Sequence, residues 1–205
     1  MSDLSKRIFS SVILLPSVVF FIFIGSIYLK FLIAICFLTA SYEWNKIVKK
    51  KLYKLAGFIF LIFSFYTFYK LSIEYVVIIP LFISISTDIG GYVFGKIFKG
   101  PKLTKISPNK TYAGMIGGYL MSLLFISLYF NYFNYEFSFE WFITIIFISS
   151  VSQIGDIIIS YFKRLSNLKN TGNFIPGHGG LLDRIDGMIF ALPTFYLINL
   201  TGFII

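Results

Sequence analysis

Residues 141–162 read WFITIIFISSVSQIGDIIISYF, a run in which Asp156 is the single charged side chain. A helix needs about 20 mostly apolar residues to cross the ~30 Å hydrocarbon core of a bilayer. The run therefore predicts a membrane-spanning helix. Ionisable side chains are costly at membrane depth and usually mark a functional site, so Asp156 near one end of the run is a candidate site residue.

Six further apolar runs surround this one along the chain. They are bounded by charged residues or by Gly, Pro and Asn: Ile8–Ile27, Phe31–Val48, Leu55–Tyr69, Tyr75–Phe94, Met115–Phe133 and Met188–Ile205. The run at Leu55–Tyr69 is short, and Gly25 with Lys30 separates the first two runs only weakly. Continuous apolar runs also exclude the alternating pattern of a membrane β-barrel. We expect an all-α bundle of about seven transmembrane spans that forms a single integral membrane domain over residues 1–205.

Composition agrees with a membrane protein. Of the 205 residues, 57% are hydrophobic and only 13% are charged, and the mean hydropathy is +0.83. Soluble domains carry about 25% charged residues, so an ordinary soluble globule is excluded. The 26 Phe and 14 Tyr exclude disorder. With Cys36 and His178 as the only residues of their types, cysteine metal clusters and two-histidine metal motifs are excluded as well.

The charges are distributed asymmetrically. If the N-terminus is cytoplasmic, sixteen of the 18 Lys and Arg residues fall on that side of the predicted spans, and only Lys30 and Lys70 fall on the other. This asymmetry predicts a cytoplasmic N-terminus. Glu43 is expected to begin the second basic loop. Four other carboxylates are expected at the cytoplasmic ends of spans: Asp88, Asp156, Asp183 and Asp186.

The segment Ser160–Asp186 reads SYFKRLSNLKNTGNFIPGHGGLLDRID. In a helix, the spacing of Asp183 and Asp186 puts both carboxylates on one face, where they suit Mg²⁺. Glycines let backbone N–H groups approach an anion closely. Phosphate oxygens also attract cations, which this segment supplies. These groups are typical of a phosphoryl- or nucleotidyl-transfer site, built from Lys163, Arg164, Lys169, Gly177, Gly179, Gly180 and Arg184.

Other interpretations of this segment are open on spacing alone. The two aspartates flanking Arg184 also suit a structural ion-pair turn, and a basic loop beside a membrane also serves as a topology signal. His178, set between glycines, is a candidate acid–base group, a phosphate donor or a turn residue.

The segment resembles the signature of the phosphatidate cytidylyltransferases (CDP-diacylglycerol synthases). Its form is S-x-apolar-K-R, then K-D, a small residue, P-x-H-G-G and D-R-x-D, and Ser160, Lys163, Arg164, Lys169, Gly172, Pro176, His178, Gly179, Gly180, Asp183, Arg184 and Asp186 fall in register. Residues 86–96 and 102–118 resemble two further family regions, and Tyr42-Glu43-Trp44 is a weak match. The sequence departs from the family pattern at Ala113 and Ile159, where Glu is usual, and at Asn170, where Asp is usual.

The resemblance implies that CTP and phosphatidic acid give CDP-diacylglycerol and pyrophosphate. The active-site segments are then 86–118 and 153–187, at the cytoplasmic face of a membrane that we expect to be the bacterial inner membrane. Mg²⁺ is assigned to Asp183 and Asp186, with Asp156 and Asp88 completing its shell or holding a second cation. The expected catalytic residues are Asp183, Asp186, Lys163, Arg164 and His178, and the expected substrate-binding residues are Lys96, Ser107, Lys110, Lys169, Gly179, Gly180 and Arg184.

The expected partners are the lipid bilayer and the two substrates, with no nucleic acid. Family members often work as dimers, so a homodimer is an expectation from the resemblance alone. Two other functions are open. One is a transporter of a phosphorylated solute, which would use the same basic entrance, although the internal repeats typical of transporters are not visible. The other is a weakened relative that binds lipid or CTP, suggested by the three departures from the family pattern.

Overall fold

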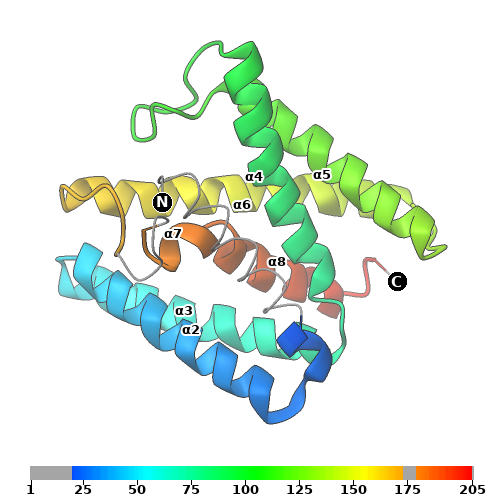
Figure 1. The fold of residues 1–205 in the computed structure, drawn as a ribbon, viewed down its shortest axis with the longest axis horizontal. Helices are drawn as coiled ribbons and strands as arrows, with labels where there is room; N and C mark the ends of the chain where they lie inside the picture. The colour runs from blue at the N-terminus through cyan, green and yellow to red at the C-terminus, as the bar shows by residue number, and fades with distance from the viewer. Residues whose placement is uncertain (1–19, 173–178, 205) are drawn as a thin grey trace, which may run out of the picture. The chain divides into compact units, whose positions relative to one another are not determined.

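The computed structural model describes residues 20–172 and 179–204, and its named elements are all helices (Figure 1). Besides the helices, an isolated antiparallel bridge pairs Lys102 with Thr111. The all-α prediction is therefore confirmed for the described residues. The helices are α2 (Ser26–Ile47), α3 (Lys51–Ile73), α4 (Ile78–Phe98), α5 (Tyr112–Tyr132), α6 (Phe139–Leu165), α7 (Leu182–Ile185) and α8 (Met188–Leu200).

Five of these helices, α2 to α6, are long and apolar enough to cross a membrane. At 1.5 Å per residue, a helix of 21 residues spans roughly 30 Å. Helix α8 is apolar but has only 13 residues, so the predicted span Met188–Ile205 was too long. Most of the predicted span Ile8–Ile27 lies outside the described residues. The described chain thus has five candidate spans and a shorter apolar helix.

Several helices extend beyond the apolar runs that predict them. Helix α3 has 23 residues, so the short span Leu55–Tyr69 was an underestimate. Lys30 and Lys70, expected in loops, lie inside α2 and in the last turn of α3. Their ammonium groups lie 5.9 Å and 5.8 Å from the ring centroids of Tyr69 and Tyr66. Long lysine stems and cation–π contacts allow a charge within a helix that is otherwise apolar.

The chain forms two compact units. The first unit comprises the described parts of Met1–Val76 and Phe162–Asp186. In it, α2 and α3 lie side by side (Figure 1). The Phe37 ring packs between Phe58 and Phe65, with centroid distances of 5.6 Å and 5.8 Å. Trp44, at the cytoplasmic end predicted for α2, is buried against Phe162 at 4.9 Å and donates its indole N–H to the Lys54 carbonyl.

The second unit comprises Val77–Tyr161 and the described part of Gly187–Ile205. Glycines bring α4 and α5 into close contact, since a Cβ at Gly114 would lie 2.6 Å from the Gly91 carbonyl oxygen. A Cβ at Gly90 would likewise overlap the Gly117 backbone. Small residues permit this close approach in membrane helices. A hydrogen bond from Thr87 Oγ1 to Ser149 Oγ (2.8 Å) connects α4 with α6.

Candidate active site

The segment singled out in the sequence contains a buried ion pair in the first unit. Lys163, in the last turn of α6, places its Nζ 2.7 Å from Asp183 Oδ1, at the start of α7. The two side chains are 10% and 8% exposed. Charges this deeply buried are stable only when paired and hydrogen-bonded, so each of these residues requires the other.

Asp183 also organises the backbone around it. Its Oδ2 accepts hydrogen bonds from the amides of Thr171 (2.8 Å) and Gly180 (3.1 Å) and from Thr171 Oγ1 (3.1 Å). The backbone stays helical from Leu182 through Asp186, which confirms the predicted helical spacing of the two aspartates. Asp186 is buried, with 8% exposure.

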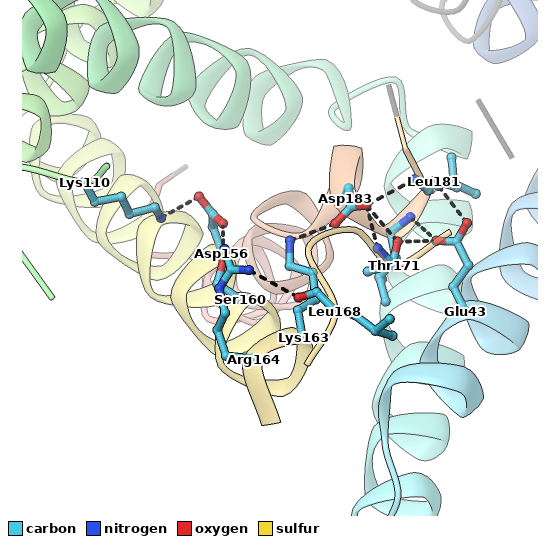
Figure 2. A network of polar contacts seen from close by, with 12 residues as sticks. Glu43, Lys110, Asp156, Ser160, Lys163, Arg164, Leu168, Thr171, Leu181 and Asp183 are labelled. Atoms are coloured by element: carbon cyan, nitrogen blue, oxygen red, sulfur yellow. Dashed lines mark hydrogen bonds and ion pairs between the residues drawn. The ribbon is translucent and has the colours of Figure 1, made fainter. Parts of the chain in front are cut away.

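Glu43 is the residue that sequence reasoning misplaced. It lies inside α2 rather than at the start of a loop, and it is only 2% exposed. Oε1 accepts from the Leu181 amide (2.9 Å), whereas Oε2 accepts from the Leu182 amide and from Thr171 Oγ1 (both 2.8 Å; Figure 2). A lone carboxylate within an apolar helix was the available signal, the same one that drew attention to Asp156.

We call Glu43, Lys163, Thr171 and Asp183 the signature cluster. The other basic residues of the segment, Arg164, Lys169 and Arg184, are exposed. Arg164 Nη1 donates to the Leu168 carbonyl at 3.2 Å, which fixes the turn after α6. Gly179 has a φ of 88°, a left-handed conformation that favours glycine. Gly177 and His178 lie outside the described residues.

A second polar group, the loop cluster, lies in the second unit and consists of Lys110, Asp156 and Ser160. Lys110 Nζ lies 2.5 Å from Asp156 Oδ2 (Figure 2). It also lies 3.4 Å from the Gln153 carbonyl oxygen. Ser160 Oγ donates to Asp156 Oδ1 at 3.3 Å. The Lys110 and Asp156 side chains are 23% and 25% exposed, so this pair is more accessible to water than the pair in the signature cluster.

The loop between α4 and α5 positions Lys110. The Lys110 amide donates to the Ser107 carbonyl (3.0 Å), and its carbonyl accepts from the Leu103 amide (2.8 Å). Two predicted nucleotide-binding residues, Ser107 and Lys110, are therefore close together. The third, Lys96, is exposed in the last turn of α4 with its ammonium 5.6 Å from the Tyr92 ring centroid. Asp88 is also exposed on α4.

The predicted magnesium site depends on two neighbouring carboxylates. Carboxylate oxygens are the ligands that Mg²⁺ prefers, and Asp183 and Asp186 supply them within one short helical segment. In residues 20–172 and 179–204, no group of three or more His, Cys, Asp or Glu side chains forms a metal-binding arrangement. The carboxylate ligands fit Mg²⁺. Asp183 accepts four hydrogen bonds, so it would have to give up some of them to coordinate the ion.

Five helices long and apolar enough to cross a membrane, together with two lysine–aspartate pairs, define an integral membrane protein with clustered polar residues. The model of the cytidylyltransferase family matches residues 52–201 of the chain. A phosphatidate cytidylyltransferase of Rickettsia bellii is 36% identical over 97% of this chain and 91% of its own length. The chain belongs to the cytidylyltransferase family, so the family resemblance is confirmed.

Two other relatives carry the same name. A phosphatidate cytidylyltransferase of Staphylococcus haemolyticus is 35% identical over 85% of this chain and 70% of its own length. One of Rickettsia typhi is 42% identical over 56% of this chain, and there the match spans about half (54%) of the relative's length.

Proposed function

We propose that this protein transfers the cytidylyl group of CTP to phosphatidic acid, giving CDP-diacylglycerol and pyrophosphate. The observation that carries the proposal is the similarity to a phosphatidate cytidylyltransferase along 97% of the chain. The buried signature cluster supports it, because the same segment that resembles the family signature forms an acid–base cluster.

In this reaction, a phosphate oxygen of the lipid attacks the α-phosphorus of CTP. The bond between the α-phosphorus and the bridging oxygen breaks, and pyrophosphate leaves with the electron pair. The attacking phosphate is already an anion near neutral pH, so no dedicated general base is needed. The protein must instead position two anionic substrates and neutralise their charge.

We call Ser160–Asp186 the signature segment. Its exposed cations suit this task. Arg164, Lys169 and Arg184 are assigned to phosphate oxygens of the lipid and of pyrophosphate, because charge-assisted hydrogen bonds to phosphate are strong. The amides of Gly179 and Gly180 belong to the same segment, and Gly180 holds Asp183 in place. His178 keeps its predicted catalytic role as an acid–base group or a phosphate donor.

The nucleotide is assigned to Ser107, Lys110 and Lys96. Ser107 and Lys110 are held in one loop by backbone hydrogen bonds, which orients the lysine before substrate arrives.

Magnesium is assigned to Asp183 and Asp186, where its charge would neutralise phosphate oxygens as the new bond forms. Asp156 and Asp88 belong to the second unit, and their part in binding a second cation is a separate proposal. The orientation in the membrane is proposed too: a cytoplasmic N-terminus and an active site facing the cytoplasm of a bacterium. A homodimer follows only from the family.

The test is a transfer assay with purified protein in detergent, phosphatidic acid, Mg²⁺ and CTP labelled at the α-phosphate. We expect the label to move into the lipid phase, whereas label at the γ-phosphate remains in the aqueous phase as pyrophosphate. Glu74→Gln, a neutralisation at an exposed position, serves as a control variant. No lipid label with the α-labelled nucleotide, or flux of a phosphorylated solute into proteoliposomes without CTP, would refute the proposal.

A further inference from the structure

The donors that bind Glu43 all come from the signature segment. Thr171 lies before residues 173–178, and Leu181 and Leu182 lie after them. One carboxylate on α2 thus joins the two flanks of the segment that contains Pro176 and His178. These contacts connect positions 128 to 139 residues apart, so they fix tertiary structure rather than a local turn.

The glycines of the segment fit around this carboxylate. A Cβ at Gly172 would lie 2.8 Å from Glu43 Oε1, and a Cβ at Gly180 would lie 2.5 Å from Oε2 and overlap Thr171 Oγ1. Contacts under 3.0 Å require a shift of the surrounding atoms. A side chain at either position would therefore displace the Glu43 carboxylate or the Thr171 hydroxyl from its present place, which is an observation independent of the hydrogen bonds.

Thr171 connects Glu43 with the acid–base pair. Its hydroxyl lies 2.8 Å from Glu43 Oε2 and 3.1 Å from Asp183 Oδ2, and it has one proton to share between them. Asp183 in turn binds Lys163. A displacement of Thr171 therefore affects Asp183, which is assigned to magnesium, and through Asp183 it affects Lys163.

We propose that Glu43 is a positioning residue for cytidylyl transfer, whose carboxylate clamps both flanks of the signature segment and so orients Asp183 and the phosphate-binding groups. The inference rests on the proposed function. Its physical basis is that misplacing reacting groups by about 1 Å can reduce a rate by roughly 100-fold. Carboxylate hydrogen bonds to backbone amides are strong enough to hold such a geometry.

Glu43→Gln tests the clamp with almost no change in side-chain volume. The amide offers one acceptor oxygen and turns an NH₂ group toward a donor, so at least one of the three contacts is lost. We expect kcat per folded protein to fall at least tenfold with the KM for CTP changed less than threefold. Glu43→Asp keeps the charge and should retain more activity than Glu43→Gln. Glu74→Gln, the same change at an exposed site, should behave as wild type.

Hydrogen exchange reports the clamp without activity. In Glu43→Gln, the amides of Leu181 and Leu182 should exchange faster, while α4 and α5 exchange as in wild type.

If wild type transfers label but the kcat of Glu43→Gln is unchanged, the inference is wrong and the proposed function stands. If wild type transfers no label, the proposed function fails, and unchanged amide protection in Glu43→Gln overturns the clamp as well. Should Glu43→Gln fail to fold, Glu43→Asp and Thr171→Val decide: wild-type kcat in both overturns the inference, and reduced kcat in both supports it.

Discussion

Removing one partner of the buried Lys163–Asp183 pair should strongly destabilise the protein. Lys163→Met preserves the length of the side chain but leaves Asp183, 8% exposed, without a cation. Loss of one member of a buried pair costs about 3–5 kcal/mol. Three neutral donors, the amides of Thr171 and Gly180 and the Thr171 hydroxyl, remain on Asp183, so we expect a value near the lower end, about 3 kcal/mol. That value reduces the folding equilibrium constant by roughly 100-fold.

The assay is reversible unfolding in mixed micelles by SDS titration, followed by tryptophan fluorescence, since Trp44 lies in the same unit as the pair. Lys110→Met is the matched control, because it makes the same change at a pair with side chains 23% and 25% exposed. Partly exposed pairs contribute about 1 kcal/mol or less. The double variant Lys163→Met/Asp183→Asn removes both charges and should cost less than the sum of the two single variants.

If Lys163→Met costs no more free energy of unfolding than Lys110→Met, the buried pair does not stabilise the protein more than the partly exposed pair. Strict additivity in the double variant would also contradict the stabilising role of the buried pair, because independent effects are the signature of residues that do not interact.

Three further results are expected. Asp186→Asn should reduce cytidylyl transfer at least 100-fold without changing membrane insertion, and turnover near that of wild type would refute its role in metal binding. Gly90→Ala should destabilise the second unit by about 1–3 kcal/mol, because its Cβ overlaps the Gly117 backbone, whereas Gly91→Ala should be tolerated, because its Cβ meets the Gly114 carbonyl oxygen at 3.8 Å. Equal effects of the two substitutions in the same SDS titration would contradict the described packing. Chelation of Mg²⁺ should abolish transfer of α-labelled CTP into lipid, and transfer that persists in excess chelator would refute the metal requirement.

The membrane helices could be predicted from the sequence because apolar runs report burial in lipid directly. The ends of the helices could not be predicted in this way. Lys30 and Lys70 lie within helices, but a search for apolar residues stops at these charges. The run at Met188–Ile205 shows the opposite error: hydropathy continues to the C-terminus, but the helix ends at Leu200. Hydropathy reports whether a side chain prefers lipid or water. Helix length also depends on backbone hydrogen bonding, which hydropathy does not report.

Part of the candidate site could likewise be predicted from the sequence, and part could not. The helical spacing of Asp183 and Asp186 is local, so sequence spacing predicted it. The environment of Glu43 is not local, because its donors follow it by more than 120 residues, and no periodicity within α2 indicates them. The pairing of Lys163 with Asp183 could not be predicted either. Four cations in the segment were equally suited to bind phosphate, and only the fold shows that Lys163 is the buried one.

The exposure of the two lysine–aspartate pairs gives them different parts in the proposed reaction. An incoming triphosphate that takes Lys110 from Asp156 breaks a partly exposed pair, at a cost of about 1 kcal/mol or less. Taking Lys163 from Asp183 would leave a buried carboxylate without its cation, at about 3–5 kcal/mol. Because only the first exchange is small compared with a charge-assisted phosphate contact, Lys110 is the lysine suited to bind the nucleotide. Lys163 is better suited to hold Asp183 and the signature segment in place while the exposed Arg164, Lys169 and Arg184 meet the phosphates.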